Sequence, residues 1–352
     1  MKKILITGNE ALAEGAITAG CSFYAGYPIT PQNEIPAFMA KRMPQAGGIF
    51  IQAESELSAI NMVFGAAAAG VRAMTSSSSP GISLKQEGIS YIAGAQLPAV
   101  IVNVMRGGPG LGNIWPAQSD YFQATRSGGH GDYHCIVLAP ASVQEAYDIM
   151  PLGFNLADKY RMPVEILADG MLGQMMEPLK IQNQKSKIKN YKKPWALTGA
   201  NGRKPNIVKS FYMKEGDLEK FNLILQKKYT SIKQTEQRWE DFYLDDARII
   251  LVAYGTMSRI AKAVVNKLRS KGKKIGLIRP ITLWPFPKNI FHKIALSHKK
   301  STILVIEMSY GQMLEDVKLS LDCKLPVKFL GRAGGGIPKE EEIIKTVSRL
   351  IS

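Results

Sequence analysis

The sequence has few of the residues that build metal centres and hydrolytic active sites. It contains 3 cysteines and 4 histidines among 352 residues, and Cys21, Cys135 and Cys323 are far apart along the chain. No CxxC pair occurs, so we expect no metal site and no iron–sulfur cluster on this chain. P-loop, GxSxG and HExxH patterns are also missing. These absences argue against nucleotide hydrolysis, serine hydrolysis and zinc proteolysis.

Long apolar runs are missing as well. No stretch approaches the ~18 consecutive apolar residues of a membrane-spanning helix. The apolar run in the N-terminal MKKILITGNEA is too short for a signal peptide. Together with the low cysteine content, this predicts a cytoplasmic protein with no membrane segment.

Acidic residues are outnumbered by basic ones. The chain has 45 Lys and Arg against 29 Asp and Glu, a formal net charge of +16. Such a charge attracts polyanions, and a nucleic-acid-binding protein is one hypothesis that would show salt-dependent binding. The lysines, however, are spread over 180–233 and 267–300, with no motif that combines basic and aromatic residues. We therefore predict no nucleic-acid partner.

Apolar runs of strand length alternate with helical patterns through most of the chain, which predicts an α/β fold with a parallel sheet. Ser142, followed by Glu145, is expected to cap the last helix of the first half. We expect a first domain over 1–176, a basic connecting segment over 177–246 with one helix over 216–246, and a smaller α/β domain over 247–352. The predicted strands of the first half are 4–7, 49–52, 73–76, 99–104, 136–139 and 164–168, and the helices are 9–19, 30–43, 54–69, 81–94 and 142–159.

Two acids open the otherwise apolar segment QAESELSAINMVFGAAAAG, residues 52–70. On a helix that begins near Glu54, Glu56 shares a face with Ile60 and Val63, whereas Glu54 faces polar neighbours. A carboxylate on an apolar face needs a partner or a raised pKa. The alternative is that both acids only complement the helix dipole.

Three further segments place polar groups where a strand ends. In AGYPITP, residues 25–31, Thr30 is expected to cap a helix that starts near Pro31, which makes either an anion site or an ordinary turn. In VMRGGPG, Arg106 follows a buried strand, where a guanidinium suits carboxylate recognition. TSSSSPG, residues 75–81, is a similar junction rich in hydrogen-bond donors.

Taken in order, these segments resemble one family. GNEALAEGAITAG, GYPITP, QAESELSAI, TSSSSPG, VMRGGPG and QSD are similar to the 2-oxoacid:ferredoxin oxidoreductases, in the subunit that holds the pyrimidine-binding domain for thiamine diphosphate. The later segments RPITLWPFP and VIEMSYGQM resemble the transketolase C-terminal-like domain that follows it. The resemblance is strongest to the 3-methyl-2-oxobutanoate (valine) type and next to the 2-oxoglutarate type.

The resemblance implies a role for particular residues. Glu56 matches the catalytic glutamate that bonds N1′ of the aminopyrimidine of thiamine diphosphate. Thr30 and Arg106 match substrate-binding residues, and Arg106 would hold the substrate carboxylate. The neighbouring Tyr27, Pro28 and Ile29 are expected to contact the cofactor.

The chain departs from a complete enzyme in this family. It has no GDG motif followed by NN, the pattern that binds Mg²⁺ and the diphosphate. We therefore expect the other half of the site on a separate diphosphate-binding subunit, which would also hold Mg²⁺. A ferredoxin-like subunit with [4Fe–4S] clusters and a γ-type subunit would complete a hetero-oligomer that acts on a 2-oxoacid and coenzyme A.

Two other enzyme types remain open at this point. One is a 2-oxoglutarate:ferredoxin oxidoreductase subunit. The other is an E1 β-type dehydrogenase or transketolase-like subunit that passes carbon to lipoamide or a sugar. GYPITP together with VMRGGPG favours a ferredoxin-linked enzyme.

Overall fold

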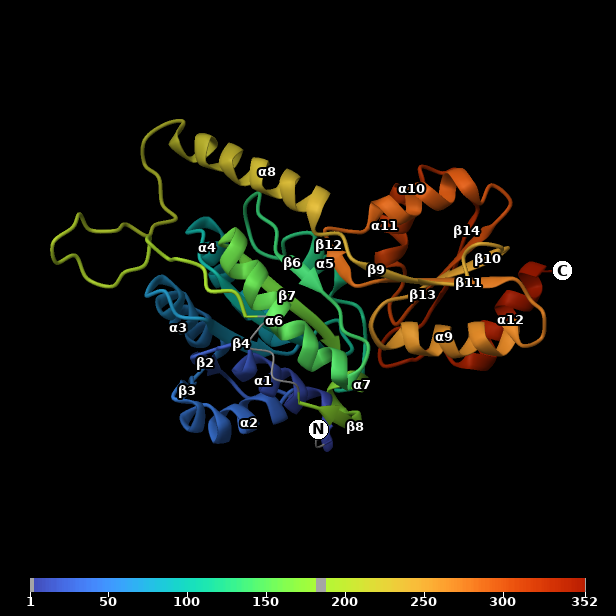
Figure 1. Ribbon diagram of the computed structural model, residues 1–352, viewed down its shortest axis with the longest axis horizontal. Coiled ribbons are helices and arrows are strands. Elements are labelled where there is room, and N and C mark those ends of the chain that lie inside the picture. Colours follow the sequence, from blue (N-terminus) through green and yellow to red (C-terminus); the bar gives the residue numbers. More distant parts are fainter. Residues whose placement is uncertain (1–2, 182–187, 352) are drawn as a thin grey trace.

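A seven-stranded sheet forms the centre of the N-terminal unit of this computed structural model, which describes residues 3–181 and 188–351 (Figure 1). The strand order is β12-β6-β7-β5-β4-β2-β3, and all neighbours are parallel except β12 and β6. The predicted parallel α/β sheet is therefore confirmed. Its strands are β2 (Phe23–Gly26), β3 (Ile49–Gln52), β4 (Ala73–Ser77), β5 (Ala99–Met105), β6 (Ile136–Leu138), β7 (Pro163–Asp169) and β12 (Thr282–Trp284).

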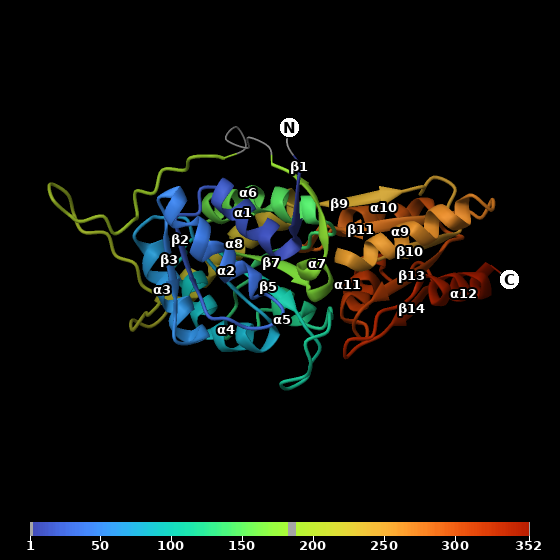
Figure 2. The same ribbon diagram turned by 90° about the horizontal axis from the view of Figure 1, so that it is seen from below.

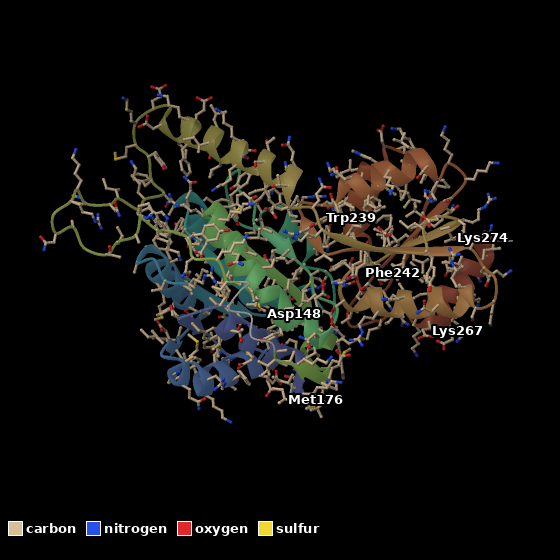
Figure 3. All side chains as sticks on the ribbon, in the orientation of Figure 1. Asp148, Met176, Trp239, Phe242, Lys267 and Lys274 are labelled. Carbon is tan, nitrogen blue, oxygen red and sulfur yellow. The ribbon has the colours of Figure 1, made fainter. Side chains whose placement is uncertain are left out.

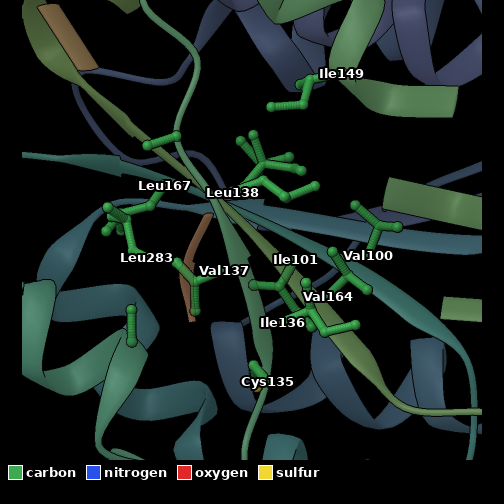
Figure 4. Close-up of a cluster of buried hydrophobic side chains, with 14 of the residues drawn as sticks. Val100, Ile101, Cys135, Ile136, Val137, Leu138, Ile149, Val164, Leu167 and Leu283 are labelled. Atoms are coloured by element: carbon green, nitrogen blue, oxygen red, sulfur yellow. The ribbon is translucent and has the colours of Figure 1, made fainter. Parts of the chain in front are cut away.

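The central strands are apolar because both of their faces are covered. Every residue of β5 and β7 is buried. Figure 4 shows Val100 and Ile101 of β5 close to Val164 of β7 and Ile136 of β6. Near-continuous Val, Ile and Leu runs of this kind are typical of parallel strands with helices on both sides.

The helices divide between the two faces in the way that right-handed crossovers require. Helices α1 (Gly8–Thr18), α2 (Glu34–Arg42) and α6 (Val143–Tyr160) pack together on one face, and α3 (Glu56–Ala68) packs against α4 (Ser79–Gly94) on the other. The cap of α6 is as predicted, since the Glu145 backbone N–H donates to Ser142 Oγ at 3.1 Å. The short helices of this unit are η1 (Pro44–Ala46), α5 (Tyr121–Thr125) and α7 (Gly170–Gln174).

Three elements differ from the sequence-based prediction. The first predicted strand exists as β1 (Lys3–Thr7), but it pairs antiparallel with β8 (Met176–Lys180) in a separate two-stranded sheet. Helix α2 begins at Glu34 and not near Pro31. The single helix predicted over 216–246 is wrong, because α8 (Asp217–Thr235) ends and is followed by strand β9 (Trp239–Phe242). Part of the connecting segment, 182–187, lies outside the described residues.

The C-terminal unit has a five-stranded sheet of order β14-β13-β10-β11-β9. Figure 3 shows Trp239 of β9 near the junction of the units and Phe242 further into the second one. The strands are β10 (Ile249–Val252), β11 (Ile275–Pro280), β13 (Thr302–Glu307) and β14 (Val327–Gly331), and the helices are α9 (Gly255–Arg269), α10 (Lys288–Ser297), α11 (Gln312–Leu321) and α12 (Glu340–Ile351).

Buried polar contacts join the two units, which lie side by side in both views (Figures 1 and 2). Gln118 donates to the Tyr254 carbonyl at 3.0 Å and accepts from the Met308 N–H at 3.0 Å. Strand β12 also crosses from the second unit to pair with β6. These bonds fix the loop after β5 against the C-terminal unit.

Candidate active site

The loops that follow β2, β3, β4 and β5 meet at one edge of the large sheet. These strands are parallel, so their carboxyl ends lie together. The chain goes from β2 outward to β3 and then back across β2 to β4, so its direction reverses between these strands. Ligands of open α/β sheets bind at carboxyl ends beside such a reversal.

Glu56 is the first residue of α3, directly after the loop from β3. Ser55 caps the helix by accepting from the Ser58 N–H at 3.1 Å. Glu56 is 6% exposed, whereas Glu54 is exposed and accepts from Ser58 Oγ at 2.6 Å. That bond holds the pKa of the Glu54 carboxyl below its usual value. The predicted difference in burial between the two acids is therefore confirmed.

Gly81, in the first turn of α4, makes room for the Glu56 carboxylate. A Cβ at this glycine would lie 2.7 Å from Glu56 Oε1 and 2.1 Å from Ser77 Oγ. Both distances are below any normal contact, so the two side chains occupy the space that a larger residue would need. The glycine of TSSSSPG thus places the serine-rich loop directly against Glu56.

Several polar atoms around Glu56 have no partner within the described chain. No hydrogen bond reaches the Glu56 carboxylate from residues 3–181 or 188–351, and the buried Ser77 Oγ and Ser78 Oγ are unpaired there as well. Buried polar groups are normally paired with protein, water or a ligand. A carboxylate and two hydroxyls without hydrogen-bond partners in the described chain are suited to a ligand with its own polar atoms, such as the aminopyrimidine of thiamine diphosphate.

Lys85 lies against the first turn of α3 and was missed by the sequence analysis. Its side chain is 0% exposed, and Nζ donates to the Glu56 backbone oxygen at 3.2 Å and to Thr75 Oγ1 at 3.2 Å. Burial lowers the pKa of Lys85 to about 7, while the Glu56 carboxylate acts in the opposite direction. A lysine in a helix is normally a surface residue, so no local sequence signal could have identified Lys85 as buried.

Arg106 is at the end of β5 and points back to the loop after β2. Its guanidinium donates from Nη1 to the Thr30 carbonyl at 2.9 Å and from Nη2 to the Leu111 carbonyl at 3.0 Å. It is 7% exposed, and its Nε has no partner among the described residues. The structure thus brings the predicted Arg106 and Thr30 together. Ser79 Oγ also accepts from the Arg106 backbone N–H at 3.0 Å.

Thr30 does not cap α2, contrary to the sequence-based expectation. The residue before that helix is Asn33, whose Nδ2 donates to Thr30 Oγ1 at 3.2 Å. The Thr30 side chain is exposed. Its hydroxyl therefore lies at the surface of the site loop instead of bonding the first turn of the helix.

The loop after β2, which carries the other predicted cofactor contacts, is fixed by hydrogen bonds of Gln32. Gln32 is 0% exposed; its amide donates to the Tyr27 carbonyl at 3.3 Å and accepts from Ser76 Oγ at 2.5 Å. Tyr27 and Pro28 are exposed and Ile29 is half-buried. The loop after β2 is thereby tied to the end of β4, with its apolar side chains left available for a ligand.

A buried acidic cluster lies behind the serine loop and was also missed. Asp120 Oδ2 accepts from Ser79 Oγ at 2.6 Å and from Asn103 Nδ2 at 3.1 Å. Burial raises the pKa of Asp120 and, with the nearby Asp120 charge, raises the pKa of Glu165 to about 8. These side chains fix the loop after β5, which contains the QSD segment.

A cavity of about 570 Å³ opens beside Thr30. It lies between the loop after β2, the loop after β5 and α7, and one side chain of the C-terminal unit reaches it. Its lining is Thr30, Pro31, Asn33, Glu34, Ile114, Trp115, Pro116, Gly170, Met171, Gln174, Met175 and Ile337.

Two kinds of feature are absent from the part of the chain that the structure describes. Within 3–181 and 188–351, no three His, Cys, Asp or Glu side chains are grouped so that they could hold a metal ion. In the same residues, no helix combines the length and apolar character needed to cross a membrane.

The family follows from the fold, the site and the sequence together. Residues 14–237 match the family model for the thiamine-diphosphate-binding part of pyruvate flavodoxin/ferredoxin oxidoreductases, and residues 247–343 match core domain II of pyruvate:ferredoxin oxidoreductase. The chain belongs to the 2-oxoacid:ferredoxin oxidoreductase family, whose members are oxidoreductases, and its fold is a thiamine-diphosphate-binding domain followed by a transketolase C-terminal-like domain.

Two curated relatives show which branch of the family this chain is most similar to among those compared. The ketoisovalerate oxidoreductase subunit VorB of Methanothermobacter marburgensis is 49% identical over 98% of this chain and 97% of its own length. The 2-oxoglutarate synthase subunit KorA of Methanocaldococcus jannaschii is 36% identical over 99% of this chain and 100% of its own length.

Solved structures agree with this assignment. The 2-oxoglutarate:ferredoxin oxidoreductase from Magnetococcus marinus, with 2-oxoglutarate, coenzyme A and succinyl-CoA bound, superposes with a TM-score of 0.89 at 26% identity. The match covers 99% of this chain, which spans 65% of that chain's length. An inactive tetramer of a split-gene transketolase matches with a TM-score of 0.60 at 13% identity over 98% of this chain and 97% of its own length, which shows the shared fold alone.

Proposed function

We propose that this chain supplies the pyrimidine half of the thiamine diphosphate site in a 3-methyl-2-oxobutanoate:ferredoxin oxidoreductase. The complete enzyme would convert a branched 2-oxoacid and coenzyme A to an acyl-CoA and CO₂, with the electron pair passing to ferredoxin. The observation that carries the proposal is the buried Glu56 carboxylate, which lies against Gly81 and receives no hydrogen bond from the described chain. The higher identity to VorB than to KorA supports the branched substrate.

Glu56 would bind the cofactor and manage its proton. When bound, thiamine diphosphate supplies a carbon nucleophile that attacks the 2-oxo group and accepts the electrons left by decarboxylation. A buried carboxylate hydrogen-bonded to N1′ of the aminopyrimidine can share a proton with it, and it does so more strongly in a site that excludes water. Tyr27, Pro28 and Ile29 would contact the ring from the loop after β2.

Arg106 and Thr30 would hold the substrate. The Arg106 guanidinium has five N–H donors, of which two are used on backbone carbonyls. The unpaired Nε and the remaining Nη protons can bind a carboxylate, and the exposed Thr30 hydroxyl can bond the same ligand. The bond between Arg106 and the Thr30 carbonyl would keep both groups on one side of the substrate.

The partner that completes the site would dock on α3 and α4. The charged residues of α3 and α4 are Glu56, Lys85 and Glu87, although 21% of the whole chain is charged. Leu57 on α3 and Leu84 on α4 are 46% and 58% exposed. A surface with few charges and exposed apolar side chains is typical of a permanent interface.

We propose that the diphosphate-binding subunit covers this surface and brings Mg²⁺ with the rest of the site. The [4Fe–4S] clusters would lie on a ferredoxin-like subunit, and a γ-type subunit would complete a cytoplasmic hetero-oligomer. Within the chain, we propose a division into 1–176, 177–246 and 247–352. Strand β9 of the middle segment joins the sheet of the last segment, and strand β12 of the last segment joins the sheet of the first.

A 2-oxoglutarate-specific enzyme is the second candidate, favoured by the KorA relatives and by the Magnetococcus structure. The transketolase-like alternative is supported by the fold alone.

Substrate preference decides between the first two. The assembled complex should be purified and assayed with 3-methyl-2-oxobutanoate, 2-oxoglutarate and pyruvate, each with coenzyme A and a viologen acceptor. We expect kcat/KM to be at least tenfold higher for 3-methyl-2-oxobutanoate. A preference for 2-oxoglutarate would support the second candidate, and no viologen reduction with any 2-oxoacid would contradict both. The complex with Glu56→Gln serves as the inactive control.

A further inference from the structure

Ser79, the first residue of α4, bonds the backbone of Arg106 with its hydroxyl. Its Oγ accepts from the Arg106 N–H at 3.0 Å, and the residue is only 8% exposed. Directly after Arg106 the loop folds back on itself, since the Gly107 N–H donates to the Trp115 carbonyl at 2.9 Å. The backbone that carries the Arg106 side chain is therefore fixed between α4 and this loop.

The Ser79 hydroxyl has one proton, and two acceptors compete for it. Asp120 Oδ2 lies 2.6 Å from Ser79 Oγ, a distance typical of a hydroxyl that donates to a carboxylate. The Arg106 carbonyl oxygen lies 3.3 Å from the same Oγ. A proton donated to Asp120 leaves the Oγ lone pairs to the Arg106 N–H, whereas a proton turned towards the Arg106 carbonyl would lie close to that N–H and oppose the bond.

Asn103 of β5 bonds both Ser79 and Asp120. Its Nδ2 donates to Asp120 Oδ2 at 3.1 Å, and its Oδ1 accepts from the Ser79 N–H at 3.3 Å. Asn103 is 0% exposed, so its amide keeps this orientation. The three side chains form a closed ring of hydrogen bonds beneath Arg106.

Both chain neighbours of Asp120 are bonded to the C-terminal unit. The Ser119 carbonyl accepts from Gln312 Nε2 at 2.7 Å, and Tyr121 Oη donates to Asp316 Oδ2 at 2.6 Å. Gln312 belongs to the VIEMSYGQM segment and Asp120 to QSD. The C-terminal unit thus fixes the residue that orients the Ser79 hydroxyl.

We propose that Asp120 is a positioning residue for Arg106, which acts by taking the proton of the Ser79 hydroxyl. The hydroxyl then holds the Arg106 backbone, while the Thr30 and Leu111 carbonyls hold the guanidinium. The inference rests on the proposed function, in which Arg106 binds the carboxylate of the 2-oxoacid. Through this chain of bonds, the C-terminal unit sets the place of the substrate carboxylate.

The test compares substrate and cofactor binding in the assembled complex. KM and kcat are measured with the 2-oxoacid that the wild type prefers, and the Kd of Mg²⁺–thiamine diphosphate is measured by calorimetry. Asp120→Ala removes the acceptor, Asp120→Asn keeps an acceptor of the same shape, and Ser79→Ala removes the hydroxyl between Asp120 and Arg106. The matched control is Thr125→Val, which removes a buried hydroxyl that donates to the Tyr121 carbonyl at 2.7 Å.

Asp120→Ala and Ser79→Ala should each raise KM about tenfold, the effect of one weakened charged hydrogen bond, with a smaller change in kcat. The Kd of the cofactor should stay within about threefold of the wild type, and Asp120→Asn should keep KM within the same range. Thr125→Val should lower the melting temperature and leave KM in place. In an Arg106→Ala complex, adding Asp120→Ala should lower kcat/KM by less than about twofold, because Asp120 acts through the arginine.

An unchanged KM in Asp120→Ala and Ser79→Ala would overturn the inference. A further loss of about tenfold in the Arg106→Ala background, or an Asp120→Asn complex as impaired as Asp120→Ala, would also overturn it. If Asp120→Ala does not assemble, Ser79→Ala and Asp120→Asn decide the question by the same criteria. If none of the three assembles while Thr125→Val does, Asp120 is a purely structural residue and the inference is wrong.

Failure of the proposed function gives a different result. Arg106→Ala alone would then leave the KM for every 2-oxoacid unchanged, or the wild-type complex would bind no thiamine diphosphate. A raised KM in Arg106→Ala together with a wild-type KM in Asp120→Ala would keep the proposed function and remove only the role of Asp120.

Discussion

Gly81→Ala offers a sharp test of the geometry around Glu56. The added methyl would lie 2.1 Å from Ser77 Oγ and 2.7 Å from Glu56 Oε1, so each side chain has to withdraw by about 1 Å to reach normal contact. Overpacking of this kind costs about 1–3 kcal/mol, and the gain from replacing a helical glycine by alanine offsets up to ~1 kcal/mol of it. The net loss of stability is therefore small.

The expected effect on activity is much larger than the effect on stability. A 1 Å displacement of a reacting group can lower the rate about 100-fold. We expect the Gly81→Ala complex to assemble, to melt within a few degrees of the wild type, and to lose about 100-fold in kcat with 3-methyl-2-oxobutanoate and a viologen acceptor.

Gly88→Ala provides a matched control on the same helix. Its methyl would lie 2.5 Å from Ile60 Cγ2, so it overpacks the same pair of helices without touching Glu56. It should lower the melting temperature by a similar amount and reduce kcat less than tenfold. Wild-type activity in Gly81→Ala, or an equal loss in Gly88→Ala, would refute the reasoning.

Three other predictions concern the substrate, the buried lysine and the interface. Arg106→Ala should raise the KM for the 2-oxoacid far more than it weakens thiamine diphosphate binding; equal weakening in a calorimetric titration would place Arg106 in the cofactor site. Burial lowers the pKa of Lys85 from 10.5 to about 7, so the destabilising charge is fully present below pH 7 and is lost as the pH rises towards 10.5. Stability of the isolated wild-type chain should therefore rise relative to Lys85→Met by on the order of 2 kcal/mol between pH 7 and 9, measured by urea unfolding. A constant difference would show that burial does not lower the pKa of Lys85, so that the lysine keeps its proton in both the folded and the unfolded chain. Gly65→Ala places a methyl where nothing lies within 4 Å, so it should stabilise the isolated chain by up to ~1 kcal/mol yet weaken assembly with the diphosphate-binding subunit; unimpaired assembly would argue against docking on α3.

Elements defined by local patterns could be predicted from the sequence. Strand β5 and helix α6 follow from a continuous apolar run and from a helix with the Ser142 cap. The burial of Glu56 follows from its spacing to Ile60 and Val63 on one helix face, whereas Glu54 lies before the Ser55 cap and therefore outside the helix, which the sequence had predicted to begin near Glu54. The roles of Glu56, Thr30, Arg106, Tyr27, Pro28 and Ile29 rest on the resemblance and stay predictions.

Features that depend on distant contacts could not be predicted. Strand β12 pairs with β6, more than 140 residues earlier in the chain, and no local pattern encodes this partner. The start of α2 was misplaced because a threonine before a proline is typical of a helix cap, whereas the Thr30 carbonyl is held by Arg106. Lys85 was overlooked since its burial results from two glycines on the helix that carries it.

The central claim is that this chain holds half of a thiamine diphosphate site, with Glu56 as its contact to the cofactor. The most direct measurement is a calorimetric titration of thiamine diphosphate with Mg²⁺ into the isolated chain, into the reconstituted complex and into the complex with Glu56→Gln. We predict tight binding to the reconstituted complex, no tight binding to the isolated chain, and a clear loss of affinity in the variant complex. Tight Mg²⁺-dependent binding by the isolated chain, or an unchanged affinity in Glu56→Gln, would contradict this account.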